Sequence, residues 1–109
     1  MNVISKIKDQ ISKNPILLYM KGSPQFPSCG FSSRVVQILL SLKIKFVYVD
    51  ILKNLDIRKE LPNFSNWPTF PQLWVSGELI GGCDIISELY KNGKLKKIIK
   101  NTLKKIKKN

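Results

Sequence analysis

The spacing of apolar residues along the chain predicts alternating helices and strands. Near the N-terminus they recur at helical intervals, at Val3, Ile4, Ile7 and Ile11. Asn14-Pro15 ends this helix, because a proline cannot continue it. The run Ile16–Met20 that follows is apolar without alternation, as expected of a strand that is buried on both faces.

A second helix and a second strand are predicted in the middle of the chain. A helical pattern covers residues 34–42, and residues 46–49 are expected to form a strand. Asn54 can cap a short helix over residues 54–61, which Pro62 would close. Strand, helix and strand in this order favour a right-handed parallel βαβ unit.

A hairpin is predicted after an irregular segment. Residues 68–71 contain two prolines, which exclude regular structure there. Gln72–Val75 and residues 78–80 are expected to be antiparallel strands joined by a turn at Ser76-Gly77.

Two helices are predicted at the C-terminal end. Gly81-Gly82 precedes a helix over residues 84–90, and Asn92-Gly93 is typical of its end. The last helix has an apolar stripe formed by Leu95, Ile98, Ile99, Leu103 and Ile106, with lysines on its other face.

The composition bounds the class of protein. A chain of 109 residues with 43% hydrophobic residues is expected to form a single domain over residues 1–109 with one core. No apolar run is long enough to span a membrane, and Asp9 interrupts the N-terminal segment where a signal peptide would be uncharged. We therefore expect a cytoplasmic protein without a membrane partner.

The charge of +12 first suggests a nucleic-acid partner, but its distribution argues against one. Residues 91–108 hold nine lysines and no acidic residue, so most of the excess charge belongs to the last helix. Lysine outnumbers arginine 17 to 2 in the chain, as a genome rich in A and T would produce, and no nucleic-acid motif is recognisable. We interpret the lysines as a solvated surface.

The segment from Lys21 to Ser32 carries the candidate chemistry. It places Cys29 between the first strand and the second helix, so the thiol lies at a helix N-terminus. Free backbone N–H groups and the partial positive charge there favour the thiolate, which is both a nucleophile and a metal ligand. Lys21 adds positive charge, and two prolines stiffen the loop. A buried structural cysteine is the alternative.

The spacing Cys-X-X-Ser restricts what this thiol can do. Ser32 stands where a second cysteine would form a short-range disulfide, so Cys29 needs an external thiol or electrophile. The chain has no histidine and only one other cysteine, Cys83. It therefore cannot fill a four-thiolate metal site without ligands from another chain or a small molecule.

Three motifs together resemble the monothiol glutaredoxins of the CGFS type. They are Cys29-Gly30-Phe31-Ser32, Trp67-Pro68-Thr69-Phe70-Pro71-Gln72 and Gly81-Gly82-Cys83-Asp84. The resemblance covers nearly the whole chain and is greatest to the short, single-domain bacterial members. It implies an α/β, thioredoxin-like fold with a four-stranded mixed sheet flanked by helices. The lysine-rich C-terminus is the least family-like part.

The resemblance implies glutathione as a ligand, and the residues suit that molecule. Its binding residues would be Lys21, Arg58, Phe70 and Cys83 through their backbones, and Asp84. The two cations suit carboxylates, the helix after the double glycine offers N–H groups to an anion, and the Asp84 side chain suits an ammonium group. An extended backbone at Phe70 could pair with a peptide, and we predict a cis Phe70–Pro71 bond there.

Simpler interpretations of these residues stay open. Arg58 could be an ordinary surface residue, the double glycine only a turn, and Asp84 only a helix cap. Trp67 could pack in the core or lie at the rim of the site. Cys83 could be a packing residue or have a secondary redox role.

The thiolate count leads to the main functional hypothesis. Cys29 and one glutathione give two thiolates per chain, so two chains supply the four that a 2Fe–2S cluster needs. The resemblance implies this arrangement: a homodimer bridged by the cluster, with Cys29 as metal ligand, BolA-type partners and iron–sulfur acceptor proteins. The alternative is an enzyme in which Cys29 is catalytic, an at most weak glutathione-dependent thiol-disulfide oxidoreductase.

Overall fold

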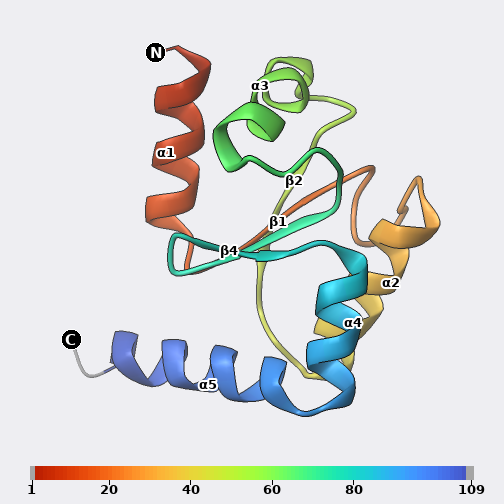
Figure 1. Ribbon diagram of the computed structural model, residues 1–109, viewed down its shortest axis with the longest axis vertical. Coiled ribbons are helices and arrows are strands. Elements are labelled where there is room, and N and C mark those ends of the chain that lie inside the picture. Colours follow the sequence, from red (N-terminus) through yellow and green to blue (C-terminus); the bar gives the residue numbers. More distant parts are fainter. Residues whose placement is uncertain (1, 108–109) are drawn as a thin grey trace.

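A computed structural model describes residues 2–107 as five helices and four strands (Figure 1). In chain order they are α1 (Val3–Lys13), β1 (Ile16–Met20), α2 (Gly30–Ser41), β2 (Val47–Asp50), α3 (Leu55–Ser65), β3 (Gln72–Val75), β4 (Glu78–Gly81), α4 (Cys83–Lys91) and α5 (Lys94–Lys107). The order of elements predicted from the sequence is confirmed.

The four strands form one mixed sheet with the order β2-β1-β3-β4. β1 pairs parallel with β2 and antiparallel with β3, and β3 pairs antiparallel with β4. Ser76 and Gly77 join β3 to β4 with positive φ angles of 48° and 81°, as a tight hairpin turn requires. The predicted fold class, a four-stranded mixed sheet flanked by helices, is therefore confirmed.

β1 is buried on both faces because its side chains alternate between two hydrophobic clusters. Ile16, Leu18 and Met20 join residues of α2, α4 and α5, whereas Leu17 and Tyr19 join residues of α1 and α3. Figure 1 shows these two groups of helices on opposite sides of the sheet. The unbroken apolar run in the sequence thus reflects a strand with no solvent-facing side.

α3 differs from the prediction, because Pro62 lies inside the helix instead of ending it. The helix continues to Ser65 and ends at Asn66, whose φ of 53° is left-handed. The N–H of Trp67 donates to the carbonyl of Pro62, which closes the last turn. Leu61 and Phe64, which precede and follow Pro62 in the sequence, pack in the hydrophobic cluster formed with α1. This burial stabilises one more turn of α3, so the helix continues past the proline.

Other boundaries shift by one residue. β2 begins at Val47 instead of residue 46, β4 reaches Gly81, and α4 begins at Cys83 instead of Asp84. The last change brings Cys83 into the first turn of the helix, where its backbone N–H has no partner within the helix.

α5 buries only the first half of its apolar stripe. Leu95 and Ile99 are fully covered, whereas Leu103 and Ile106 remain 39% and 43% exposed. Among residues 2–107, no helix combines the length and the apolar character that crossing a membrane would require.

We expect the two halves of α5 to differ in their contribution to stability. Ile99→Ala should lower the free energy of unfolding by about 2–5 kcal/mol, because it leaves a cavity in a packed cluster. Ile106→Ala is the matched control and should cost less than about 1 kcal/mol, since its side chain is already partly in water. Urea denaturation of both variants measures the difference, and equal losses would contradict the observed burial.

Candidate functional site

The candidate site lies at one edge of the sheet, where three strand ends meet. Because β3 runs antiparallel to both of its neighbours, the carboxyl ends of β1 and β4 lie beside the amino end of β3. α2 and α4 both begin at this edge, after the loop that follows β1 and directly after β4. Lys21, Cys29, Phe70 and Cys83 are therefore brought close together from distant parts of the chain.

The loop between β1 and α2 is held in one tight shape. Gly22 has a φ of 89°, and a Cβ at this position would lie 2.5 Å from the carbonyl oxygen of Phe26. The Gly22 N–H donates to Asp50 Oδ1 at 3.0 Å, and the Ser28 N–H donates to the Lys21 carbonyl at 2.9 Å. Position 22 thus requires glycine, and the loop fixes where Cys29 enters the helix.

Cys29 is the N-cap residue of α2, and Ser32 surrounds its sulfur with hydrogen-bonding groups. The Ser32 N–H donates to Cys29 Sγ at 3.4 Å, and Ser32 Oγ lies 3.7 Å from the same sulfur. The thiol donates to this hydroxyl, and the hydroxyl can rotate to donate to the thiolate. Ser32 is fully buried, and its Oγ also accepts the Lys21 backbone N–H at 3.1 Å.

The net effect is a pKa of the Cys29 thiol below its ordinary value. Partial burial by itself would raise this pKa. Hydrogen bonds from Ser32 and from the Phe31 backbone outweigh the burial, with a further contribution from the positive charge of Lys21. The lowered pKa supports the activated thiol predicted at this helix start, and Cys29 is partly exposed instead of fully buried.

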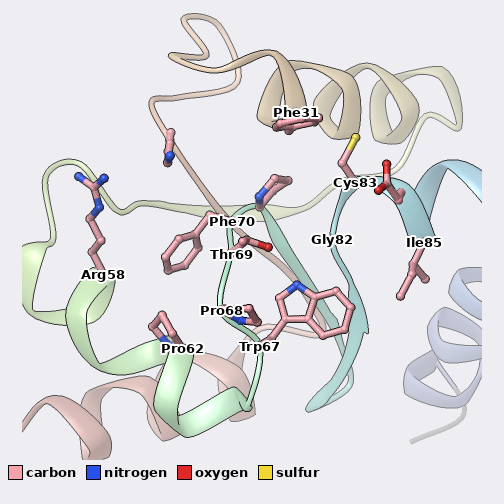
Figure 2. Close-up of a pocket in the computed structure, with 13 residues that line it drawn as sticks. Phe31, Arg58, Pro62, Trp67, Pro68, Thr69, Phe70, Gly82, Cys83 and Ile85 are labelled. Atoms are coloured by element: carbon pink, nitrogen blue, oxygen red, sulfur yellow. The ribbon is translucent and has the colours of Figure 1, made fainter.

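A cavity of about 650 Å³ opens beside the thiol. Five of the six predicted site residues line it: Lys21, Arg58, Phe70, Cys83 and Asp84. Cys29 does not line it, but its neighbour Phe31 does. In Figure 2, Arg58 reaches from α3 at one end of the cavity and Cys83 lies at the other end, with Phe31 between them on α2.

The backbone of Phe70 is free to pair with a ligand. The Phe70–Pro71 bond is cis, as predicted. Within residues 2–107, no hydrogen bond uses the Phe70 N–H or carbonyl. The β1–β3 ladder ends at the pair Tyr19 and Gln72, so Phe70 lies beyond the last paired residue of β3.

The start of α4 forms the wall opposite Arg58. Its N-cap is Gly82, which provides no capping side chain, so the first-turn N–H groups stay available. A Cβ on Gly82 would lie 3.2 Å from the Pro71 carbonyl oxygen and 3.3 Å from Trp67 Nε1, so a larger residue would crowd this wall. The double glycine is therefore more than a turn.

Cys83 and Trp67 are both part of the cavity wall. Cys83 Sγ lies 3.9 Å from Ser87 Oγ, one helical turn further along α4. Trp67 lines the cavity and so does not pack only in the core. Its Nε1 is buried and has no hydrogen-bond partner among residues 2–107.

The donor set of the chain is too small for a metal site of its own. Residues 2–107 contain no group of three or more His, Cys, Asp or Glu side chains that could hold a metal ion. Cys29 and Cys83 are free thiols, and neither belongs to such a group.

Sequence reasoning missed two residues that shape the site. Ser32 was interpreted only as an absent second thiol, yet it connects the sulfur to the end of β1. Phe31 was noted only as part of a motif, although its exposed side chain lines the cavity. The position of Ser32 three residues after an N-cap was the one available signal for its role.

Comparison with known proteins identifies the class. The Glutaredoxin family model matches residues 16–80, and the chain belongs to the glutaredoxin family. Its Cys29-Gly30-Phe31-Ser32 motif and its relatives define it as a bacterial monothiol glutaredoxin.

Three curated relatives illustrate the similarity, and each is called Glutaredoxin 4. The protein of Haemophilus ducreyi is 64% identical over 105 residues, covering 96% of this chain and 98% of the relative. That of Buchnera aphidicola subsp. Schizaphis graminum is 67% identical over 103 residues, covering 94% and 96%. That of Escherichia coli K12 is 62% identical over 104 residues, covering 95% and 90%.

Solved structures show the same thioredoxin-like fold. The reduced apo form of poplar GrxS14 matches with a TM-score of 0.80 and 44% identity, covering 93% of each chain. A buckwheat glutaredoxin in complex with glutathione matches with a TM-score of 0.80 at 24% identity, covering 91% of this chain and 88% of that one.

We expect Ser32→Ala to raise the pKa of Cys29, because it removes the hydroxyl donor to the thiolate. The rate of iodoacetamide alkylation at neutral pH should fall severalfold, and the midpoint of its pH profile should move upward. Ser33→Ala is the control, since it leaves Ser32 in place. An unchanged pH profile in Ser32→Ala would show that the helix N-terminus and Lys21 suffice.

Proposed function

We propose that this monothiol glutaredoxin, as a single domain over residues 1–109, carries 2Fe–2S clusters as cargo with glutathione as co-ligand. The observation that supports it best is one activated thiol beside a cavity with two cations and a free helix start. The proposed location is the cytoplasm.

Glutathione suits the chemistry of this cavity. It has two carboxylates, one ammonium group, a thiol and a peptide backbone. Lys21 and Arg58 are cations on the β1 and α3 sides, and the α4 N-terminus offers N–H groups to a carboxylate. The Asp84 carboxylate would bind the ammonium group. The unpaired Phe70 backbone would bind the peptide as an added strand does.

The shortage of protein ligands supports a shared cluster. One chain has two cysteines, Cys29 and Cys83, and cannot supply four thiolates by itself. With Cys83 assigned to glutathione through its backbone, Cys29 is the proposed protein ligand, and the remaining thiolates come from glutathione and from a second chain. Two copies of the site would therefore bind one cluster and form a homodimer. The resemblance to the CGFS-type monothiol glutaredoxins adds two further parts to this proposal: replacement of one copy by a BolA-type protein, and release of the cargo to iron–sulfur acceptor proteins.

A second candidate function is a glutathione-dependent oxidoreductase, favoured by the lowered pKa of Cys29. The Cys29 thiolate would attack the glutathione sulfur of a glutathionylated protein, and the protein thiolate would leave and take up a proton. A second glutathione thiolate would attack the resulting Cys29–glutathione disulfide, releasing glutathione disulfide and the Cys29 thiolate. An absorbance spectrum separates the two functions: a carrier is brown and bleaches when glutathione is removed, whereas an enzyme is colourless and turns over fast.

The two cysteines should differ completely in cluster binding. We expect Cys29→Ser to lose the cluster and remain a folded monomer, because the only ligand of the chain is gone. Cys83→Ser should keep the cluster, because we propose that Cys83 binds glutathione through its backbone and that its sulfur does not bind iron. Reconstitution of both variants with iron, sulfide and glutathione, followed by visible spectra, tests this.

Size-exclusion chromatography completes that experiment. Removal of iron from the wild-type protein should convert the dimer to a monomer, because the cluster itself joins the chains. If Cys83→Ser loses the cluster as completely as Cys29→Ser, both cysteines are ligands and the glutathione-bridged arrangement is wrong.

The lysine-rich end of α5 should be dispensable for this function. Removal of residues 102–109 should lower stability only slightly, because Leu103 and Ile106 are 39% and 43% exposed. The visible spectrum of the folded, reconstituted protein should match that of the full chain. Failure of folded truncated protein to assemble a cluster would make the end of α5 part of the site.

A further inference from the structure

Among the polar and charged residues that the structure describes, only Ser32 and Gln72 are buried. Gln72 is fully buried at the first position of β3 and directly follows the segment Trp67–Pro71, called here the proline loop. Burying an amide is costly unless all of its groups are paired, so its partners reveal what it stabilises.

Every polar atom of the Gln72 side chain has a partner. Its Nε2 donates to the carbonyl oxygens of Trp67 at 3.0 Å and Thr69 at 3.3 Å. Its Oε1 accepts the Nε1–H of Trp74 at 3.2 Å. The partners also fix which way the amide points, because the carbonyls only accept and the indole N–H only donates.

The proline loop depends on this side chain because it has few donors of its own. Pro68 and Pro71 have no N–H, and the loop forms no regular structure. Among the residues that the structure describes, the only other side-chain hydrogen bond to the carbonyls of this loop comes from Ser65 Oγ, which lies 3.4 Å from the Trp67 carbonyl oxygen. Gln72 therefore turns two carbonyls toward the interior and leaves the Phe70 N–H and carbonyl unpaired beside the cavity.

We propose that Gln72 is a positioning residue that shapes the ligand-binding backbone of the proline loop. The inference rests on the proposed glutathione site and adds to it a residue that does not line the cavity. Trp74, whose indole orients the amide, acts one step further away on the same strand.

The test compares Gln72→Met with a control on the same strand. Methionine has a similar length but leaves the Thr69 carbonyl and the Trp74 N–H unpaired, and the Trp67 carbonyl keeps only the 3.4 Å contact to Ser65 Oγ, so the proline loop should shift. Val75→Ala truncates a buried side chain of β3 that packs in the cluster with α2, α4 and α5. This cluster lies on the face of the sheet opposite to Trp74, the partner of Gln72. Both variants lose stability, but only Gln72→Met should alter the site.

Three measurements on folded protein separate positioning from stability. We expect the dissociation constant for glutathione, measured by calorimetry, to rise about tenfold in Gln72→Met and to stay within about twofold in Val75→Ala. The backbone amide signals of Thr69 and Phe70 in NMR spectra should move in Gln72→Met alone. The Cys29 alkylation rate should be unchanged in both, because the α2 start is not affected.

Trp74→Phe keeps the test decisive if Gln72→Met does not fold. It removes the N–H that orients the amide, together with part of the ring that packs beside Phe64. The Gln72 amide keeps its bonds to the two carbonyls, so glutathione affinity should fall by a smaller factor with the same two signals displaced. The inference is wrong if the Gln72 and Trp74 variants bind glutathione like the wild type, or if Val75→Ala loses as much affinity. Failure of the wild-type protein itself to bind glutathione would instead refute the proposed function.

Discussion

The double burial of β1 is the constraint on which the rest of the structure depends. This strand is paired along both edges, parallel to β2 and antiparallel to β3, and its alternating side chains enter two separate clusters. The helices must therefore divide between the two faces. The same mixed pairing brings the ends of three strands and the starts of two helices to one edge. The site is a direct result of this topology, since its residues come from separate segments of the chain, around residues 21–31, 58, 67–71 and 82–85.

The site combines groups that fold stability alone would not leave unpaired. Over the described range 2–107, the α4 start has no capping side chain, and the Phe70 backbone and the buried Trp67 Nε1 have no hydrogen-bond partner. Cys29 differs, because Ser32 provides both a hydroxyl and a backbone N–H for the sulfur. The thiol is thus organised before any ligand arrives, whereas the cavity keeps its hydrogen-bonding capacity for the ligand. This division agrees with a rigid nucleophile beside an adaptable binding surface.

Most of the fold could be predicted from the sequence, because its strands and helices have strong apolar periodicity. The activated thiol and the five cavity residues could be predicted too, since helix starts, glycines and prolines have local signatures. The predicted end of α3 at Pro62 was wrong, because the burial of Leu61 and Phe64 outweighs the destabilisation of the helix by a proline. Ser32 and Gln72 escaped notice for another reason. Their importance lies in hydrogen bonds to backbone groups that only the folded chain brings within reach.

The complete burial of Ser32 also restricts how this protein can store oxidising equivalents. Position 32 cannot share a sulfur–sulfur bond with Cys29, and its hydroxyl is engaged with the end of β1. An oxidised form of Cys29 that includes a small external thiol is a state of two molecules. By mass action, its population depends on the concentration of that thiol as well as on the surrounding redox potential. At a fixed redox potential, the oxidised fraction of such a chain therefore changes with the thiol concentration of the compartment, whereas the oxidised fraction of a local dithiol is set by the redox potential alone.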